Sequence, residues 1–161
     1  MKLEKKYSSL TNIIKKRGVI DIDAVNACFK LLSAGNRIDK ECAQRLGLHQ
    51  LSEGRFMVLA LLSEYEVLSP LEIANFSGVT KPTITSLIAS LERECLIKRN
   101  NVPTDGRKIE ISLTGEGSDL INKIFEEHSH WIVNITKNLT ESEMKTLVSI
   151  LDKMFMNTSD D

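Results

Sequence analysis

The chain has 161 residues, of which 42% are hydrophobic, 27% are charged and only 5% are aromatic. This balance is typical of an ordinary globular protein, with one domain or a small domain and appended helices. The formal net charge of −1 excludes an overall basic field that would attract nucleic acid. No stretch approaches 18 apolar residues, so we expect no membrane-spanning helix and no membrane partner.

Charge is nevertheless unevenly distributed along the sequence. Residues 1–20 carry six Lys and Arg against one Glu, and residues 114–161 carry four Lys against nine acidic residues. Residues 98–108 carry four basic residues against the single acidic Asp105. This distribution predicts one surface that binds phosphate and another that repels it.

The three cysteines, Cys28, Cys42 and Cys95, form no CxxC pair and no disulfide framework. The N-terminus shows no apolar signal segment with a cleavage site. Both features predict a reducing, cytoplasmic environment.

The first half of the chain reads as helices. Residues 1–20 are basic and weakly periodic, which predicts a short helix or arm. Apolar residues at helical spacing then predict a long helix over 22–46, closed by Gly47. Ser52 is expected to cap a third helix over 53–64, whose core face comprises Phe56, Leu59, Ala60 and Leu62.

A pair of short helices follows. Ser69, Pro70 and Glu72 form a capping-box pattern that starts the first helix, and Gly78 is expected to end it in a left-handed turn. Thr80 is expected to cap the second helix. Its buried stripe is predicted from i, i+3, i+4, i+7 spacing and comprises Ile84, Leu87, Ile88 and Leu91.

Two strand-like runs, 96–99 and 108–113, are separated by a polar connection over 100–106 and predict a β-hairpin. In the second run the alternation places Ile109, Ile111 and Leu113 inward, and Lys108, Glu110 and Ser112 outward.

Two more helices are expected, at about 115–137 and 141–156, capped by Thr114 and by a Thr140–Glu143 capping box. Their apolar faces exceed what one small domain can cover. We therefore expect an obligate homodimer.

The two short helices before and after the turn at Gly78 are joined so tightly that they are typical of a helix-turn-helix. The outer face of the second helix carries Lys81, Thr83, Thr85, Ser86 and Ser90, which can meet base edges in the major groove of double-stranded DNA. The hairpin tip brings Arg107 and Lys108 beside this helix, where a thin loop with one Arg fits the minor groove.

The run LSPLEIANFSGVTKPTITSLIASLERECLIKRNNVPTDGRKIEISLTGEG resembles the winged helix-turn-helix of the MarR (multiple antibiotic resistance regulator) family, and the upstream LSEGRFMVLALL also fits. The resemblance covers roughly 25–155. It implies a homodimeric repressor with interlaced terminal helices, in which the wing aspartate steadies the arginine that enters the minor groove. Asp105 and Arg107 stand at these two positions.

The fold class is therefore expected to be mainly α with a small β-hairpin wing, a winged helix-turn-helix plus a helical dimerisation domain. The domains are predicted at 1–50 (dimerisation), 51–114 (DNA binding) and 115–161 (dimerisation). The predicted DNA contacts are Ser69, Thr80, Lys81, Thr83, Thr85, Ser86, Arg99, Asp105, Arg107 and Lys108.

Many members of the family bind small aromatic molecules in a crevice between the dimerisation domain and the DNA-binding domains. The resemblance thus implies a small aromatic effector. We expect the helices over 22–46 and 53–64 to line this crevice, with Phe29, Phe56 and Leu59 as wall residues. Two positions depart from the family: Ser86, where relatives often have Arg, and Cys95, where relatives usually have Gly. A non-glycine residue at the latter either strains a left-handed turn or ends the helix differently.

Other functions have less support. No GxSxG, HExxH or phosphate-binding glycine loop is present, so we expect no enzyme, no catalytic residue and no cofactor. His128 and His130 point to different helix faces and are not expected to share a metal; His49 is expected to be solvated or to cap. A regulator that senses oxidation through a cysteine and a winged-helix module that binds only protein remain the alternatives.

Overall fold

The computed structural model describes residues 2–18, 21–102 and 105–156, and the side chains of these residues except 2–4, 101–102, 105–108 and 155. It divides into two compact units, 1–57 and 58–161. The helix that contains the boundary runs from the first unit into the second. No helix in the described part of the chain is long and apolar enough to cross a membrane.

The first unit is an antiparallel helix pair followed by the start of a third helix. Its elements are α1 (Lys2–Lys16), α2 (Ile22–Leu48) and the first residues of α3 (Glu53–Tyr65). The rings of Tyr7 and Phe29 stack at a centroid distance of 5.0 Å and join α1 to α2. Of the two expectations for the basic N-terminal segment, a helix or an arm, the helix is the one observed.

The long helix, predicted over 22–46 with Gly47 closing it, ends two residues later than predicted. Helix α2 continues to Leu48, and Gln50 takes the left-handed conformation with φ 56°. The amide of Leu51 donates to the carbonyl of Leu46 at 3.0 Å, which satisfies one of the last carbonyls of the helix. A glycine near a helix end does not have to be the residue that ends it, because hydrogen bonding of the last carbonyls decides the position.

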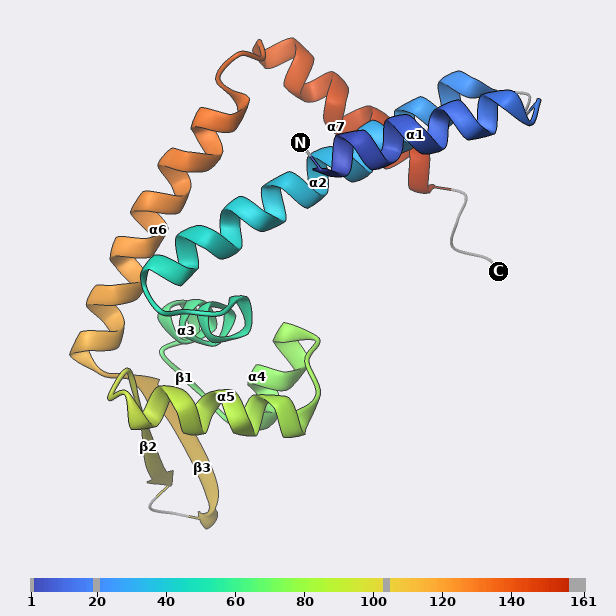
Figure 1. Ribbon diagram of the computed structural model, residues 1–161. Coiled ribbons are helices and arrows are strands. Elements are labelled where there is room, and N and C mark those ends of the chain that lie inside the picture. The colour runs from blue at the N-terminus through green and yellow to red at the C-terminus, as the bar shows by residue number, and fades with distance from the viewer. Residues whose placement is uncertain (1, 19–20, 103–104, 157–161) are drawn as a thin grey trace. The chain divides into compact units, whose positions relative to one another are not determined.

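The second unit holds the sheet, the short helix pair and two longer helices (Figure 1). After the end of α3 its elements are β1 (Val67–Leu68), α4 (Pro70–Ser77), α5 (Lys81–Arg93), β2 (Ile97–Val102), β3 (Asp105–Leu113), α6 (Gly115–Thr136) and α7 (Glu141–Phe155). The capping boxes predicted for Ser69 and Thr140 are both present, as is the cap that Thr114 provides for α6.

The core of this unit is aliphatic and includes the stripe predicted for α5. Ile84, Ile88 and Leu91 are fully buried, whereas Leu87 is half-buried. The other buried hydrophobic side chains of the unit are Val58, Leu59, Leu62, Leu68, Ile73, Ala74, Ile97, Ile111, Ile121, Ile124 and Trp131. On α3, Val58 joins the predicted core positions, while Phe56 and Ala60 are only half-buried.

The hairpin is part of a three-stranded antiparallel sheet with the order β1-β3-β2. The short strand β1, which sequence patterning missed, pairs Leu68 with Ile111, and β2 pairs Arg99 with Ile111. The strands extend into the predicted 100–106 connection, so that connection is shorter than expected.

The predicted alternation of β3 is wrong at two positions. Ser112, expected outside, is only 9% exposed, and its hydroxyl accepts a hydrogen bond from the Asn100 side chain at 3.0 Å. Ile109, expected inside, is 36% exposed. The physical reason lies in the short strand β1, which pairs only with Ile111 and Ser112 of β3. Ile109 lies beyond this pairing, where the sheet has two strands and not three.

The start of α6 packs closely on the turn between α5 and β2. A Cβ atom at Gly117 would lie 1.9 Å from the carbonyl oxygen of Leu96, so only glycine fits there. Cys95, in the same turn, adopts φ 58°. Of the two expectations for Cys95, the strained left-handed turn is the one observed, at a cost of about 1–2 kcal/mol relative to glycine.

We predict that Gly117→Ala lowers the free energy of unfolding by about 3 kcal/mol, because the added methyl group overlaps backbone that cannot move without displacing β2. Gly115→Ala is the matched control, since a Cβ atom added there, in the same helical turn, would meet nothing within 4 Å. Its effect should stay below about 1 kcal/mol. Urea unfolding at one fixed protein concentration measures both values, and equal effects would contradict the close contact.

Candidate nucleic-acid interface

Helix α5 presents one polar face to solvent because its other face is buried. Lys81, Thr83, Thr85 and Ser86 are all exposed. The sharp turn before the helix is fixed by Gly78, whose φ of 67° favours glycine. The four side chains stand in the first two turns of α5, which are the turns that a helix-turn-helix presents to base edges.

The N-terminus of α5 is open. Thr80 occupies the N-cap position, but the prediction that its side chain caps the helix is wrong, because no such hydrogen bond forms. Its hydroxyl lies 2.9 Å from the hydroxyl of Thr83 instead. Amides in this first turn therefore lack a side-chain acceptor from the N-cap, an arrangement that suits a phosphate oxygen.

The N-terminus of α4, by contrast, is closed by its own side chains. The Ser69 hydroxyl donates to the Glu72 carboxylate at 2.7 Å, and the Ser69 amide donates to the same oxygen at 2.8 Å. These two hydrogen bonds hold the pKa of Glu72 below its ordinary value. The hydroxyl of Ser69 is thus engaged in the capping box, and its predicted contact with DNA stays a prediction.

A hollow of about 700 Å³ lies where the starts of α4 and α5 meet strand β3. It brings together three of the predicted DNA contacts, Ser69, Lys81 and Thr85. Its other lining residues are Pro70, Leu71, Glu72, Ile109 and Glu110. Among the lining residues whose side chains the structure describes, two carboxylates accompany one lysine, so we expect Lys81 rather than the carboxylate-lined part of the hollow to meet a phosphate.

The predicted wing is the hairpin of β2 and β3. The backbone of Asp105, Arg107 and Lys108 belongs to β3, but their side chains lie outside the described part of the structure. The ten residues predicted to contact DNA are therefore located, and the role of each stays a prediction.

An ion pair that the sequence analysis did not predict connects the wing to α5. Helix α5 is the second helix of the helix-turn-helix and is called the recognition helix from here on. The Arg99 Nε atom on β2 donates to the Glu92 carboxylate on α5 at 2.8 Å, with both side chains about one-third exposed. The opposite charges of Glu92 and Arg99, on either side of a short turn, were the sequence signal that could have predicted this pair. Arg99 thus has a partner within the protein in addition to its predicted role at DNA.

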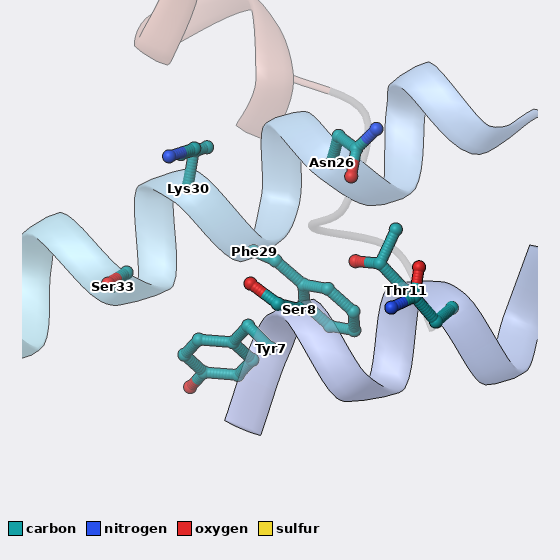
Figure 2. Close-up of a pocket in the computed structure, with 8 residues that line it drawn as sticks. Tyr7, Ser8, Thr11, Asn26, Phe29, Lys30 and Ser33 are labelled. Atoms are coloured by element: carbon teal, nitrogen blue, oxygen red, sulfur yellow. The ribbon is translucent and has the colours of Figure 1, made fainter. Parts of the chain in front are cut away.

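The three predicted effector residues differ in their surroundings. Phe29 lines a cavity of about 490 Å³ between α1 and α2, where the ring of Tyr7 stacks against it (Figure 2), and Lys30 is a further lining residue on α2. The remaining lining residues are Ser8, Thr11, Asn12, Asn26 and Ser33. Phe56 is half-buried on α3, and Leu59 is fully buried in this structure.

The cysteines differ in exposure. Cys28 and Cys95 are exposed, whereas Cys42 is half-buried. Burial, with added repulsion from Glu53 and Asp39, raises the pKa of the Cys42 thiol. Since the thiolate is the reactive form, Cys42 is less suited to sensing oxidation than an ordinary cysteine.

The histidines and carboxylates suggest no metal centre in the described part of the chain, where no three potential ligands gather. The ring of His128 lies edge-on to that of Trp131 at 5.3 Å, and His49 lies at the C-cap of α2.

Comparison with known proteins identifies the family of this chain. A family model described as the MarR family matches residues 51–109. The HTH-type transcriptional repressor YetL of Bacillus subtilis (strain 168) is 30% identical over 156 residues, which cover 96% of this chain and 93% of YetL.

Two solved structures share the fold. The S. aureus MepR–DNA complex matches with a TM-score of 0.65 and 22% identity, over 82% of this chain and 96% of that chain. NadR in complex with 4-hydroxyphenylacetate matches with a TM-score of 0.62 and 23% identity, over 80% and 93%.

The similarity to YetL extends over nearly the whole of both chains, and the family model covers the region from the start of α3 into β3. The short helices α4 and α5, the exposed polar face of α5 and the hairpin beside it are the parts of a winged helix-turn-helix. The chain belongs to the MarR family of DNA-binding transcriptional regulators, which are not enzymes.

Proposed function

We propose that this protein is a homodimeric repressor that binds an imperfect palindromic operator and releases it when a small aromatic acid binds. The observation that carries the proposal is the exposed polar face of α5, with Lys81, Thr83, Thr85 and Ser86 beside an open helix N-terminus. This arrangement suits phosphate contacts at the helix end and base contacts along the helix.

Exposed apolar side chains on α6 and α7 support the proposed dimer. Val133 on α6 is 67% exposed and Val148 on α7 is 59% exposed. Further exposed apolar side chains in this segment are Phe125, Ile132, Ile135, Leu139, Met144, Leu147, Ile150 and Met154. So much apolar surface on two neighbouring helices supports an interface with a second copy, and twofold symmetry places two recognition helices on one side of the DNA.

We expect light scattering of the full chain to give twice 18.1 kDa at micromolar concentration. The double variant Val133→Asp/Val148→Asp should shift the protein toward monomer, because buried carboxylates at an interface lack partners. Lys145→Asp on the exposed surface of α7 is the matched control and should stay dimeric. A stable, folded wild-type monomer at this concentration would contradict the proposal.

Symmetry sets the form of the operator. Recognition helices that enter successive major grooves on one face of the duplex need half-site centres about 10 bp apart or a near multiple. We propose that Thr83 and Ser86 face the bases, while Arg107 enters the minor groove and Asp105 steadies it. Footprinting on DNA fragments selected from the genome tests the symmetry, because an asymmetric single half-site contradicts it.

Arg107→Ala should weaken binding to nearly all duplexes by a similar factor, since Arg107 is proposed to act through charge and groove shape. Two wings per dimer should reduce the slope of log K against log salt by about 2. Thr83→Ala and Ser86→Ala should change base preference by roughly 1–3 kcal/mol and leave the slope nearly unchanged. Asp105→Ala should resemble a milder Arg107→Ala.

Affinities for cognate and scrambled duplexes at several salt concentrations measure these differences. Lys123→Ala on the exposed surface of α6 is the control, because it removes a cation outside the proposed DNA interface. Unchanged cognate affinity in Arg107→Ala would overturn the role of the wing.

The effector is proposed from the chemistry around Phe29. The cavity of about 490 Å³ lies within the range of about 300–1,000 Å³ that is usual for small-molecule sites. Phe29 and Tyr7 supply aromatic surface, and Lys30 supplies a cation for a carboxylate. Binding of 4-hydroxyphenylacetate by NadR, a protein of the same fold, supports this class of ligand.

Calorimetry with 4-hydroxyphenylacetate should detect binding to the free protein that weakens when cognate DNA is present, because an effector must prefer one state. Phe29→Leu should lower the affinity by removing the ring, and Phe56→Leu tests the second predicted wall residue. Phe76→Leu on the exposed surface of α4 is the control. Equal affinity for free and DNA-bound protein would exclude this compound as an effector.

A further inference from the structure

The turn between α5 and β2 depends on contacts from outside the turn. Cys95 holds a left-handed backbone without being glycine. Its amide donates to the Glu92 carbonyl and the amide of Leu96 donates to the Leu91 carbonyl, both at 3.0 Å. These bonds end the recognition helix, and the carbonyls of Cys95 and Leu96 then point away from it.

Both of those carbonyls are bound by Thr114, the residue that precedes α6. The Thr114 hydroxyl donates to the Cys95 carbonyl at 2.6 Å, and the Thr114 amide donates to the Leu96 carbonyl at 3.1 Å. The same hydroxyl accepts a hydrogen bond from the Gly117 amide at 3.1 Å. One side chain therefore both caps α6 and holds the end of α5.

Gly117 allows this junction to close. Its position against the Leu96 carbonyl leaves no room for a side chain, and Gly117 itself is buried. The backbones of the two elements thus meet directly, without an intervening side chain that could change rotamer. The end of α5, the start of β2 and the first turn of α6 are therefore joined by short hydrogen bonds and by direct backbone packing.

We infer that Thr114 and Gly117 are positioning residues that set the direction of the recognition helix from α6. They contact no DNA in this scheme. The inference rests on the proposed function, in which α6 lies at the dimer interface and each dimer holds two such junctions. The separation and angle of the two α5 helices, and hence the half-site spacing that the dimer accepts, then depend on the junction.

Thr140 provides a control within the same chain. It caps α7 with a hydroxyl that accepts from the Glu143 amide at 3.3 Å, as Thr114 caps α6. Its hydroxyl donates to the Glu143 carboxylate at 2.8 Å, inside its own helix, and not to another element. The same substitution at the two threonines therefore separates loss of a helix cap from loss of the junction.

The experiment compares Thr114→Val, Thr114→Ser and Thr140→Val as full-length proteins. The probe is the duplex that the wild-type protein selects from genomic fragments, together with versions in which the half-site spacing is changed by one base pair. We expect Thr114→Val to bind the native duplex about tenfold more weakly. Its preference for the native spacing over the altered spacings should also fall severalfold.

Thr114→Ser keeps both hydrogen bonds of the hydroxyl and should restore the wild-type affinity and preference. Thr140→Val should lower the unfolding midpoint by an amount similar to Thr114→Val, yet leave the spacing preference unchanged. A role in stability alone would weaken binding to every duplex equally. Unchanged spacing preference in a folded Thr114→Val protein would therefore overturn the inference.

Amide hydrogen exchange without DNA gives a second readout. The amides of Cys95 and Leu96 should exchange faster in Thr114→Val than in the wild type or in Thr140→Val, while those in the middle of α5 should not change. Equal exchange in all three proteins would overturn the inference. If the wild type bound only single half-sites, the proposed function would fail, and this exchange difference would still decide whether the junction exists.

Discussion

Burial of one face of α5 is the constraint on which the interface depends. Ile84, Ile88 and Leu91 are almost fully removed from solvent, and each such side chain contributes about 1.5–3 kcal/mol. Since successive residues turn by about 100° around a helix, the residues on the side opposite this stripe must point outward. Rotation of α5 about its axis would expose this stripe, so the same burial that stabilises the domain presents Thr83 and Ser86 to solvent.

The helix N-termini differ in whether a side chain caps them, and this difference separates a role in stability from a role in binding. Helices α4, α6 and α7 are closed at their N-termini by Ser69, Thr114 and Thr140. Helix α5 forgoes a side-chain cap, which elsewhere contributes about 1 kcal/mol, although Thr80 stands at the right position. An amide group that the protein leaves without a side-chain acceptor retains its capacity to bind a phosphate oxygen.

Strained turns recur at the helix ends. Gln50, Glu66 and Cys95 follow α2, α3 and α5 and all have φ near 60°. Each costs about 1–2 kcal/mol that glycine would not incur. The strain at Cys95 is offset by hydrogen bonds from Thr114, which tie the wing and the recognition helix to α6. The left-handed turn at Cys95, where glycine is usual, is thus stabilised by a hydrogen bond from Thr114, nineteen positions away in the sequence.

The sequence alone determined the helices, the Ser69 and Thr140 capping boxes, the left-handed turn at Gly78 and the exposed face of α5. These features depend on residues within a few positions of one another, through helical periodicity and local hydrogen bonds. Only the tertiary structure decided that Ser112 is buried against Asn100, that Glu92 pairs with Arg99 and that Gly117 meets Leu96. Strand pairing and packing bring together groups that periodicity treats as independent, and an i, i+2 pattern cannot report where a neighbouring strand ends.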